Sequence, residues 1–545
     1  MARSPMKHRF DRDLSRVAAI AAAVSLLSFL YYFRHGQILL YGDAVAHINI
    51  ARRVFDSQTP SLLQLGTVWL PLPHLLMIPF LLSDSMWQSG LGGSIPSMIA
   101  YVLGVVGVFR LVRGLTPDVG AGSAARVGAW VAAFVYAGNP NLIYLQTTAM
   151  TESLYLALFV WTGVYFTELV RTFRNDSPTK GAQVGATLFR GGLCLAAAEL
   201  TRYDGWFLAA AAGAIISVLA LQRWQDRGFR RASIRFLVAI AAVPLLWLAY
   251  NAAVYGNPLE FANGPYSARA IQHRSAALNP AENHTLTAAS YFLKSAELNM
   301  APGNWGRLWL AIALAALLFG LRKSRAQGAT FLLLCAPIAF YAFSIAHGGV
   351  PLYIPSWWPF TWYNIRYGLQ LLLLFSVSAG IMISALMTAA KRMAPWLAAA
   401  AFALAVFSYA SVWRTQPLCF TEAWINSRTR IALESAVERA ITALPLNSRF
   451  LMYLGDHGGI FQQAGIPLRQ SVNEGNHRPW KKPSDPSGLW ERALADPPRY
   501  VDYVIVFDGD AVDHTVDRTH LILLNEIHTT GQPHGRIYAT KPGAP

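Results

Sequence analysis

Residues 17–56 read VAAIAAAVSLLSFLYYFRHGQILLYGDAVAHINIARRVFD, and they decide the fold of this chain. Residues 17–33 are apolar over nearly the whole length of a membrane-spanning helix, which needs about 20 such residues. The chain of 545 residues is 54% hydrophobic and only 14% charged, whereas an ordinary soluble domain is about 25% charged. The sequence therefore predicts a polytopic α-helical membrane protein.

About eleven apolar segments have the length and hydropathy of a membrane span. They lie near residues 17–33, 95–113, 126–143, 153–170, 189–201, 206–222, 236–254, 305–321, 329–346, 367–388 and 395–412. The basic segments between them all fall on one side: 3–16, 110–126, 171–190, 223–235, 322–325 and 391–392. Because basic loops face the cytoplasm, we expect a protein of the cytoplasmic (inner) membrane with its N-terminus inside and its C-terminus outside. The net charge of +16 then reflects topology, and no nucleic-acid partner is expected.

Two domains are predicted. Residues 1–412 form a membrane module, whose first outer loop, 34–94, contains an interfacial helix over 44–55. From residue 413 hydropathy drops, and strand patterns (RFLMYLGD, YVDYVIVFD) alternate with a helical one (SRTRIALESAVERAITAL). Residues 413–545 are therefore expected to form an extracytoplasmic α/β domain with a partly parallel sheet.

Charged residues are grouped along the predicted helix 44–55. Asp43 directly precedes this helix and suits either a helix N-cap or a functional acid. His47 lies four residues further on, at the same edge of the helix. Arg52 and Arg53 are expected to be solvated charges that face lipid headgroups at the outer membrane surface.

A second part of the same loop, SLLQLGTVWLPLPHLLMIPF (61–80), is apolar but broken by prolines. We expect it to be re-entrant or to lie at the surface, since it is too broken for an ordinary span. Its His74 is either a structural histidine or a substrate contact. Glu152, in the first turn of the span near 153–170, is either stabilised by the helix dipole alone or functional.

The segment AAELTRYDGWF joins two predicted spans and contains Glu199, Arg202, Tyr203 and Asp204. Charges are costly so close to the bilayer, at up to about 2.5–3.5 kcal/mol per group at its centre. Polar groups gathered there indicate a wet cavity, and an ion pair between Arg202 and Asp204 within the turn is the alternative.

The segment PSWWPFTWYNIRYGLQ precedes the span near 367–388 and has the aromatic residues of a membrane-interface belt, among them Tyr363. Arg366 lies within it. This arginine either extends to the interface with its charged end in water or binds a phosphate with its planar guanidinium.

Together these motifs resemble the GT-C superfamily of polytopic glycosyltransferases, and within it the group of protein O-mannosyltransferases and lipid A aminoarabinose transferases. YGDAVAHINIARR matches the group's acidic residue in the first outer loop, Asp43, and AMTESLYL matches a second acid, Glu152. LTRYDGW resembles the group's short helix hairpin with a basic residue, Arg202, and YNIRYGL its late outer-face arginine, Arg366. WLPLPHLL resembles its proline-bearing segment but lacks the lysine often seen there. The resemblance covers about residues 10–412.

The resemblance implies transfer of a sugar from a polyprenyl-phosphate donor to an acceptor on the extracytoplasmic face, with inversion. Asp43 would be the general base, and Glu152, the second catalytic candidate, would either position the acceptor or help to hold the pKa of Asp43 in a suitable range. Arg366 and Arg202 would bind the donor phosphate. The other substrate-binding candidates are His47, His74, Tyr203, Asp204 and Tyr363. No cofactor is expected, although a divalent metal between the two acids and the phosphate stays open.

Two other functions remain as alternatives. A flippase or transporter of lipid-linked sugars commonly has inverted repeats and polar groups at the bilayer midplane. The sequence shows no such repeat, and its acids lie at the outer face. A polysaccharide polymerase or ligase also uses polyprenyl-linked sugars but has its arginines in one very large outer loop.

Overall fold

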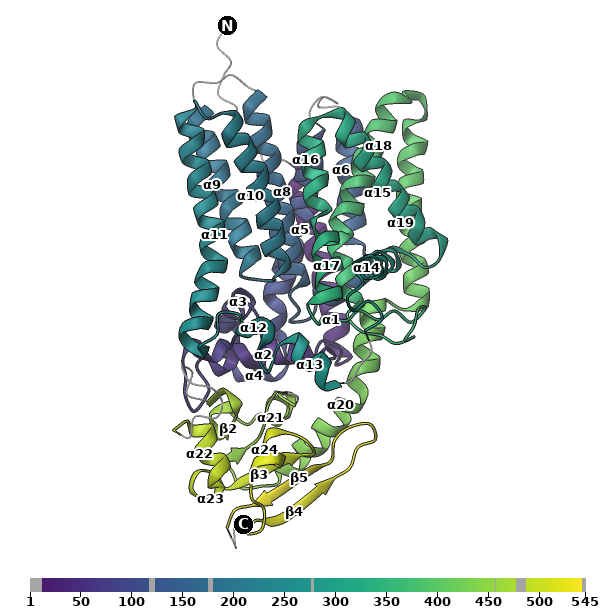
Figure 1. The fold of residues 1–545 in the computed structure, drawn as a ribbon. Helices are drawn as coiled ribbons and strands as arrows, with labels where there is room; N and C mark the ends of the chain where they lie inside the picture. Colours follow the sequence, from purple (N-terminus) through teal and green to yellow (C-terminus); the bar gives the residue numbers. More distant parts are fainter. Residues whose placement is uncertain are drawn as a thin grey trace.

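The structure, a computed structural model, describes residues 12–116, 123–174, 180–275, 279–455, 457–476 and 487–541. This part of the chain is a long helical bundle with a small α/β unit at one end (Figure 1). The first helix starts at the end of the bundle that is remote from the α/β unit. The basic residues before it, predicted to be cytoplasmic, lie outside the described residues.

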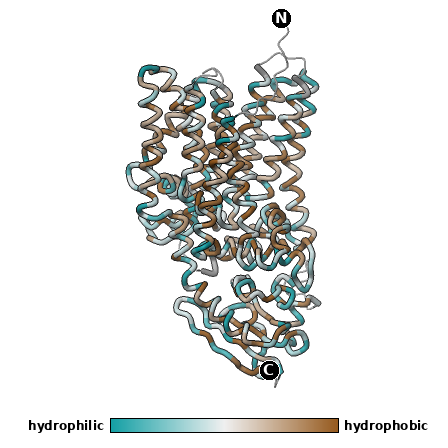
Figure 2. The backbone as a smooth tube through the Cα atoms, turned by 180° about the vertical axis from the view of Figure 1, so that it is seen from behind, coloured by the Kyte–Doolittle hydropathy of each residue, from teal (hydrophilic) through white to brown (hydrophobic). Residues whose placement is uncertain are grey.

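The bundle contains twelve helices, and every predicted span coincides with one or two of them. They are α1 (Arg12–Arg34), α5 (Leu91–Leu115), α6 (Ser123–Ala137), α8 (Glu152–Arg174), α9 (Lys180–Glu199), α10 (Asp204–Gln222), α11 (Arg227–Tyr255), α15 (Asn304–Lys323), α16 (Arg325–Leu334), α17 (Ala336–His347), α18 (Leu372–Ala389) and α19 (Ala394–Thr415). Within the described residues, nine helical stretches are long and apolar enough to cross a membrane; α6 is apolar but shorter. Apolar residues run along the bundle in Figure 2. The predicted polytopic helical architecture is confirmed.

The centre of the bundle is formed by α18, which packs against α6 and α5. Gly128 of α6 and Gly380 of α18 lie so close that a Cβ atom on either residue would overlap the carbonyl oxygen of the other. Small residues of this kind let membrane helices approach each other without a side chain between them.

A layer of short elements separates the bundle from the α/β unit (Figure 1). Its members are α2 (Gly42–Arg53), η1 (Leu62–Leu65), α3 (Leu72–Leu81), α4 (Asp84–Gln88), α7 (Pro140–Leu145), α12 (Glu260–Asn263), α13 (Ala268–Ser275) and η3 (Ile365–Leu371). The longer α14 (Thr285–Met300) packs beside α17 at the side of the bundle (Figure 1). The proline-broken segment forms η1 and α3, and α3 has only 10 residues. It is therefore shorter than a span, as its prolines predicted.

The first helix of this layer, α2, begins one residue earlier than Asp43. The N-cap residue is Tyr41, which makes no side-chain cap bond, so the expectation that Asp43 caps the helix is wrong. Asp43 lies inside the first turn instead, where a carboxylate still has a favourable interaction with the helix dipole.

The other end of α2 also differs from the prediction. Arg52 is only 4% exposed, and its guanidinium bonds to Asp56 at 2.8 Å and to Asp84 at 2.6 Å. Arg53 pairs with Glu474 of the α/β unit at 3.4 Å. The two arginines therefore do not face lipid headgroups. Protein covers α2 on both sides, and a buried guanidinium is tolerated only where carboxylates neutralise it.

The α/β unit begins with α20 (Leu418–Thr442), the helix predicted there, and contains a five-stranded sheet of order β2-β1-β3-β5-β4. The strands are β1 (Phe450–Leu451), β2 (Ser471–Val472), β3 (Tyr503–Phe507), β4 (Ile522–Ile527) and β5 (Gly535–Ala539), with α21 (Gly459–Ala464), α22 (Leu489–Ala495), α23 (Pro497–Tyr500) and α24 (Ala511–Thr515) around them. β1 is parallel to β2 and β3, whereas β5 is antiparallel to β3 and β4. The prediction of a partly parallel sheet is confirmed.

The α/β unit is bonded to α2 by a short polar network. The amide of Asn49 donates to the backbone oxygen of Gly458 at 3.1 Å and to the side chain of Gln462 at 2.9 Å. Trp87 of α4 donates its indole N–H to the same asparagine at 3.0 Å. The helix that carries Asp43 is thus fixed from both sides, by the membrane module and by the α/β unit.

Candidate active site

The centre of the candidate site is Arg366, which lies in η3 just before α18. Its guanidinium reaches three carboxylates: Nη2 lies 2.5 Å from Asp43 Oδ2, and Nη1 lies 3.0 Å from Glu422 Oε1. Nε lies 3.4 Å from Glu152 Oε1. Asp43, Glu152 and Glu422 come from α2, α8 and α20, so one arginine joins the first outer loop, the membrane bundle and the helix that follows it.

The backbone around Arg366 is shaped by its neighbours. Asn364 has φ +58°, in the left-handed region that asparagine tolerates better than most residues. The N–H groups of Asn364 and Ile365 donate to the Glu422 carboxylate at 3.1 and 2.8 Å. From α14, Ser295 and Asn299 donate to the backbone oxygen of Ile365 at 2.7 and 2.9 Å. These bonds fix the direction in which the Arg366 side chain leaves the backbone.

A second guanidinium, that of Arg202, lies between α9 and α10. Its Nη1 donates to Thr151 Oγ1 at 2.9 Å and to Glu152 Oε1 at 3.1 Å. Its Nε lies 3.3 Å from Asp204, and its Nη2 donates to the hydroxyl of Tyr341 at 2.9 Å. The turn pair of Arg202 and Asp204 is therefore present. It is also part of a larger network, because one oxygen of Glu152 lies between the two arginines.

An aromatic ring also joins the two guanidiniums. The Cζ atoms of Arg366 and Arg202 lie 5.3 and 5.5 Å from the ring centre of Tyr367. The ring of Tyr41 lies 5.1 Å from the Cζ atom of Arg366. Cation–π contacts of this kind favour a guanidinium that has lost part of its hydration.

Exposure distinguishes one member of this cluster from the rest. The side chain of Asp43 is 42% exposed, that of Arg366 is 9% exposed, and that of Glu152 is fully buried. One oxygen of Glu152, Oε2, has no hydrogen-bond partner among the described residues. Asp43 is therefore the carboxylate that a molecule from outside can reach directly.

The two predicted histidines form a buried pair between α2 and α3. Nδ1 of His47 lies 2.8 Å from Nε2 of His74, and both residues are at most 3% exposed. Burial, together with the positive charges of Arg202 and Arg366, lowers the pKa of His47 to about 3. His47 is thus neutral at ordinary pH and lies beside the arginines rather than among their ion pairs.

The two predicted tyrosines lie at different depths. Tyr203 donates to the backbone oxygen of Val68 at 3.1 Å, and its ring is stacked on Phe261. Tyr363 is 42% exposed. Desolvation of its hydroxyl and the negative charge of Asp43 raise the pKa of Tyr363. Tyr363 is therefore close to the exposed carboxylate, whereas Tyr203 supports the segment that leads to α3.

Sequence reasoning missed Glu422 and the tyrosines at positions 341 and 367. A glutamate in LCFTEAWINS, in the first turns after the last predicted span, is the signal that could have revealed Glu422. Its position after residue 412 placed it in the other predicted domain. The side chain is 2% exposed and enters the site from there.

The chemistry of the site also bears on metal binding. Among the described residues, no three histidine, cysteine, aspartate or glutamate side chains are arranged to hold an ion. The guanidinium of Arg366 contacts both Asp43 and Glu152, the two acids that would hold a metal next to a phosphate. In this arrangement the guanidinium of Arg366 is the positive charge that lies next to the two acids.

Comparison with solved structures identifies the fold. The chain is similar to ArnT from Cupriavidus metallidurans in the apo state, with a TM-score of 0.54 and 11% sequence identity over 96% of this chain and 98% of that one. It is also similar to ArnT of the same organism bound to undecaprenyl phosphate, with a TM-score of 0.53 and 12% identity over the same shares. No protein-family model and no curated protein matches the sequence. ArnT is a lipid A aminoarabinose transferase of the GT-C type, so the chain has the fold that its motifs predicted.

Proposed function

We propose that this protein transfers a sugar from a polyprenyl-phosphate donor to an acceptor on the extracytoplasmic face of the cytoplasmic membrane. The observation that carries the proposal is the pair of Asp43 and Arg366. A half-exposed carboxylate lies 2.5 Å from a guanidinium that is otherwise enclosed by buried acids. The fold adds support, because ArnT from Cupriavidus metallidurans binds undecaprenyl phosphate.

The proposed chemistry is a single displacement at the anomeric carbon. An acceptor hydroxyl gives its proton to Asp43 while its oxygen forms a bond to the anomeric carbon. The bond between that carbon and the phosphate oxygen breaks, and both of its electrons leave with the polyprenyl phosphate. Arg366 stabilises the negative charge on the departing phosphate. Attack from the face opposite the leaving group inverts the anomeric centre.

Donor binding and activation of the base are coupled in this proposal. In the structure, Nη2 of Arg366 donates a hydrogen bond to Asp43. We infer that a donor phosphate replaces Asp43 at this nitrogen, because a phosphate oxygen forms an equally strong charge-assisted bond. Glu422 and Glu152 keep the guanidinium in place during the exchange. Asp43 is then free to accept the proton of the acceptor.

The other predicted residues have supporting roles in the proposal. Arg202 adds positive charge near the phosphate and holds Glu152, which positions the acceptor. Tyr363, close to Asp43, and Asp204, paired with Arg202, contact substrate, and His47, His74 and Tyr203 support the segments around them. Residues 1–412 act as the membrane module and 413–545 as the outer domain, with the N-terminus in the cytoplasm.

The direct test is donor turnover by the purified full-length protein. A panel of undecaprenyl-phosphate sugars is supplied in detergent together with solubilised cell-envelope material as the source of the acceptor, and release of undecaprenyl phosphate is measured for the wild type and for Asp43→Asn. Release that depends on the carboxylate is expected with one of the sugars. Glycan analysis of a deletion strain separates the alternatives: loss of a single sugar supports the transferase. Loss of long chains indicates a polymerase or ligase, and donor trapped on the cytoplasmic face indicates a flippase; either result would overturn the proposal.

A further inference from the structure

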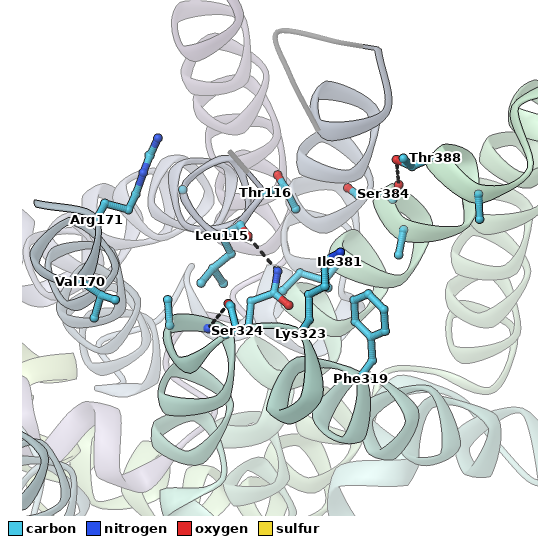
Figure 3. A pocket seen from close by; sticks show the side chains of 15 residues that line it. Leu115, Thr116, Val170, Arg171, Phe319, Lys323, Ser324, Ile381, Ser384 and Thr388 are labelled. Atoms are coloured by element: carbon cyan, nitrogen blue, oxygen red, sulfur yellow. Dashed lines mark hydrogen bonds between the residues drawn. The ribbon is translucent and has the colours of Figure 1, made fainter. Parts of the chain in front are cut away.

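A cavity of about 330 Å³ opens at the end of the bundle remote from the candidate active site. It lies where α5, α8, α15 and α18 end and α16 begins, as Figure 3 shows from close by. Those four helix ends are also ends of candidate membrane spans. The cavity is therefore at the depth of lipid headgroups, and its size is at the lower end of the range of known ligand pockets, about 300–1,000 Å³.

The residues that line the cavity give it a positive charge. Lys323, in the last turn of α15, extends into the ring of lining side chains in Figure 3, whereas Arg171 stands at the rim. None of the described residues that line the cavity is acidic. No ion pair of Lys323 occurs in the described part of the chain. Among the described residues, neither cation has an acidic partner in the cavity lining, so both can pair with an anion that enters from the membrane surface.

The walls below the cations are apolar. Leu115, Val170, Phe319 and Ile381 line the cavity. A free inorganic anion does not need such walls, whereas the glycerol region and upper acyl carbons of a lipid do. Basic pockets between membrane helices on the cytoplasmic side are typical binding places for anionic lipid headgroups.

One buried polar atom adds a more specific requirement. Gln327 of α16 lines the cavity and is only 6% exposed. Its Nε2 donates to the backbone oxygen of Leu115 at 2.9 Å, which orients the amide. Its Oε1 has no hydrogen-bond partner among the described residues. A buried acceptor without a partner costs about 1–3 kcal/mol, so a ligand that donates a hydrogen bond there would bind more tightly.

We propose that this cavity binds the headgroup of an anionic phospholipid that carries a hydroxyl beyond its phosphate. The phosphate pairs with Lys323 and Arg171, the hydroxyl donates to Oε1 of Gln327, and the acyl chains lie along the apolar walls. The site is separate from the proposed transfer reaction, because it lies at the opposite end of the spans.

The experiment uses the full-length protein in detergent and measures bound lipid by native mass spectrometry. The probes are phosphatidylglycerol, phosphatidylmethanol, which has the same charge but no headgroup hydroxyl, and zwitterionic phosphatidylcholine. The wild type is expected to bind phosphatidylglycerol most tightly. Lys323→Gln should weaken that binding about fivefold, the effect of one basic residue near an anionic membrane surface. Arg322→Gln is the matched control, because Arg322 is exposed on the same helix turn but does not line the cavity.

Gln327→Leu tests the hydroxyl separately. This variant should bind the two anionic lipids equally, with its affinity for phosphatidylmethanol unchanged. Equal binding of phosphatidylglycerol by the wild type, Lys323→Gln and Arg322→Gln would overturn the proposal. Displacement of the lipid by millimolar inorganic phosphate would overturn it as well, because it would identify a site for free anions.

Discussion

The first turn of α2 contains Asp43, and the segment just after its last turn contains Asp56. Each carboxylate pairs closely with an arginine: Asp43 with Arg366 at 2.5 Å and Asp56 with Arg52 at 2.8 Å. Their surroundings differ, because the side chain of Asp43 is 42% exposed and that of Asp56 is 1% exposed. A short ion pair is thus no sign of function by itself. A substrate can reach and separate the pair of Asp43 and Arg366, which is therefore the candidate for catalysis. The enclosed pair of Asp56 and Arg52 has a structural role, and we call this end of α2 the anchor end.

The partners of the two acids support the same distinction. Arg52 also donates to the backbone oxygen of Leu81 at 2.6 Å, and its Cζ atom lies 4.8 Å from the ring centre of Trp87. Asp56 accepts from Arg469 of the α/β unit at 3.3 Å. The Asp56 end of α2 therefore fixes the loop 34–94 to α3, α4 and the α/β unit. The Asp43 end faces the guanidinium of Arg366, which a substrate can reach.

The largest expected effect is that of Asp43→Asn on turnover. The amide keeps the size of the side chain but cannot take a proton, so donor turnover should fall on the order of 10²–10⁴-fold, as for loss of a general base. Asp84→Asn is the control, since that carboxylate is 71% exposed and also pairs with an arginine. If Asp43→Asn and Asp84→Asn both kept near-normal turnover, Asp43 would have only a structural role, as Asp56 has.

Arg366→Lys is expected to reduce turnover by roughly 10²–10³-fold, nearly as much as Arg366→Ala. An ammonium cannot keep the contacts with Glu422 and Glu152 and also bind the donor phosphate with the geometry of a planar guanidinium. The measurement is donor turnover together with binding of undecaprenyl phosphate at matched amounts of folded protein. Arg469→Lys is the control, because this arginine is 64% exposed and serves the anchor end. A fully active lysine variant would contradict the role of Arg366 in phosphate binding.

Glu422→Gln should have a smaller effect, roughly a tenfold rise in KM for the donor with a lesser change in kcat. The amide has one acceptor oxygen where the carboxylate has two, so it can keep only part of the bonds from Asn364, Ile365 and Arg366. A neutral acceptor also holds a guanidinium about half as strongly. Glu434→Gln is matched closely, because Glu434 is a buried glutamate of the same helix, 2.6 Å from Arg430. The control should change stability without changing KM. If Glu422→Gln and Glu434→Gln had the same KM for the donor, Glu422 would have only a structural role.

At the anchor end, Asp56→Asn should change stability and not turnover. Removal of one partner of a buried ion pair costs about 3–5 kcal/mol, so the thermal midpoint in detergent should fall clearly. Turnover per folded molecule should stay within about twofold of the wild type. Asp84→Asn removes the exposed partner of the same arginine and should cost at most about 1 kcal/mol. A selective loss of turnover in Asp56→Asn would contradict the assignment of a structural role to the Asp56 end of α2 and a catalytic role to the Asp43 end.

The smallest effect is expected midway along α2, at His47. Its pKa in the folded protein is about 3, below the value of about 6.5 in an unfolded chain. The unfolded state therefore binds the proton first, and stability falls as the pH drops from about 6.5 toward 3, by up to about 1.4 kcal/mol per unit. His47→Gln should reduce this fall in thermal midpoints measured between pH 7.5 and 5, whereas His35→Gln, at an exposed site, should not. If the thermal midpoint of His47→Gln fell with pH as steeply as that of the wild type, the ring of His47 would already be solvated in the folded protein.

Features that depend on local sequence could be predicted. An apolar segment of span length is buried in a membrane whatever its neighbours are, so the helices of the bundle coincide with the predicted spans. Asp43, Glu152, Arg202 and Arg366 could be selected because charge is costly near a bilayer and needs a reason. The structure brings these four into one network of ion pairs. Whether they catalyse transfer stays a prediction.

What could not be predicted depends on contacts between distant segments. Arg52 was predicted to be solvated because it lies on the polar face of a helix. Helical periodicity identifies that face but cannot show that other parts of the protein cover it. Glu422 was not selected, since nothing near it in sequence indicates the buried arginine 56 positions earlier. Burial of a charge is decided by its partner, and the partner is fixed only by the tertiary fold.

The location of Glu422 on α20 has a consequence for synthesis and for engineering. The ribosome has made all the predicted spans by residue 412, yet the guanidinium of Arg366 still lacks its partner on α20. A chain stopped at that point would have an incomplete site, so we expect nascent protein to stay inactive until α20 has been made and has folded back onto η3. For chimaeras, an exchange of outer domains between such proteins should join the chains after Thr442, where α20 ends, and not after the last span.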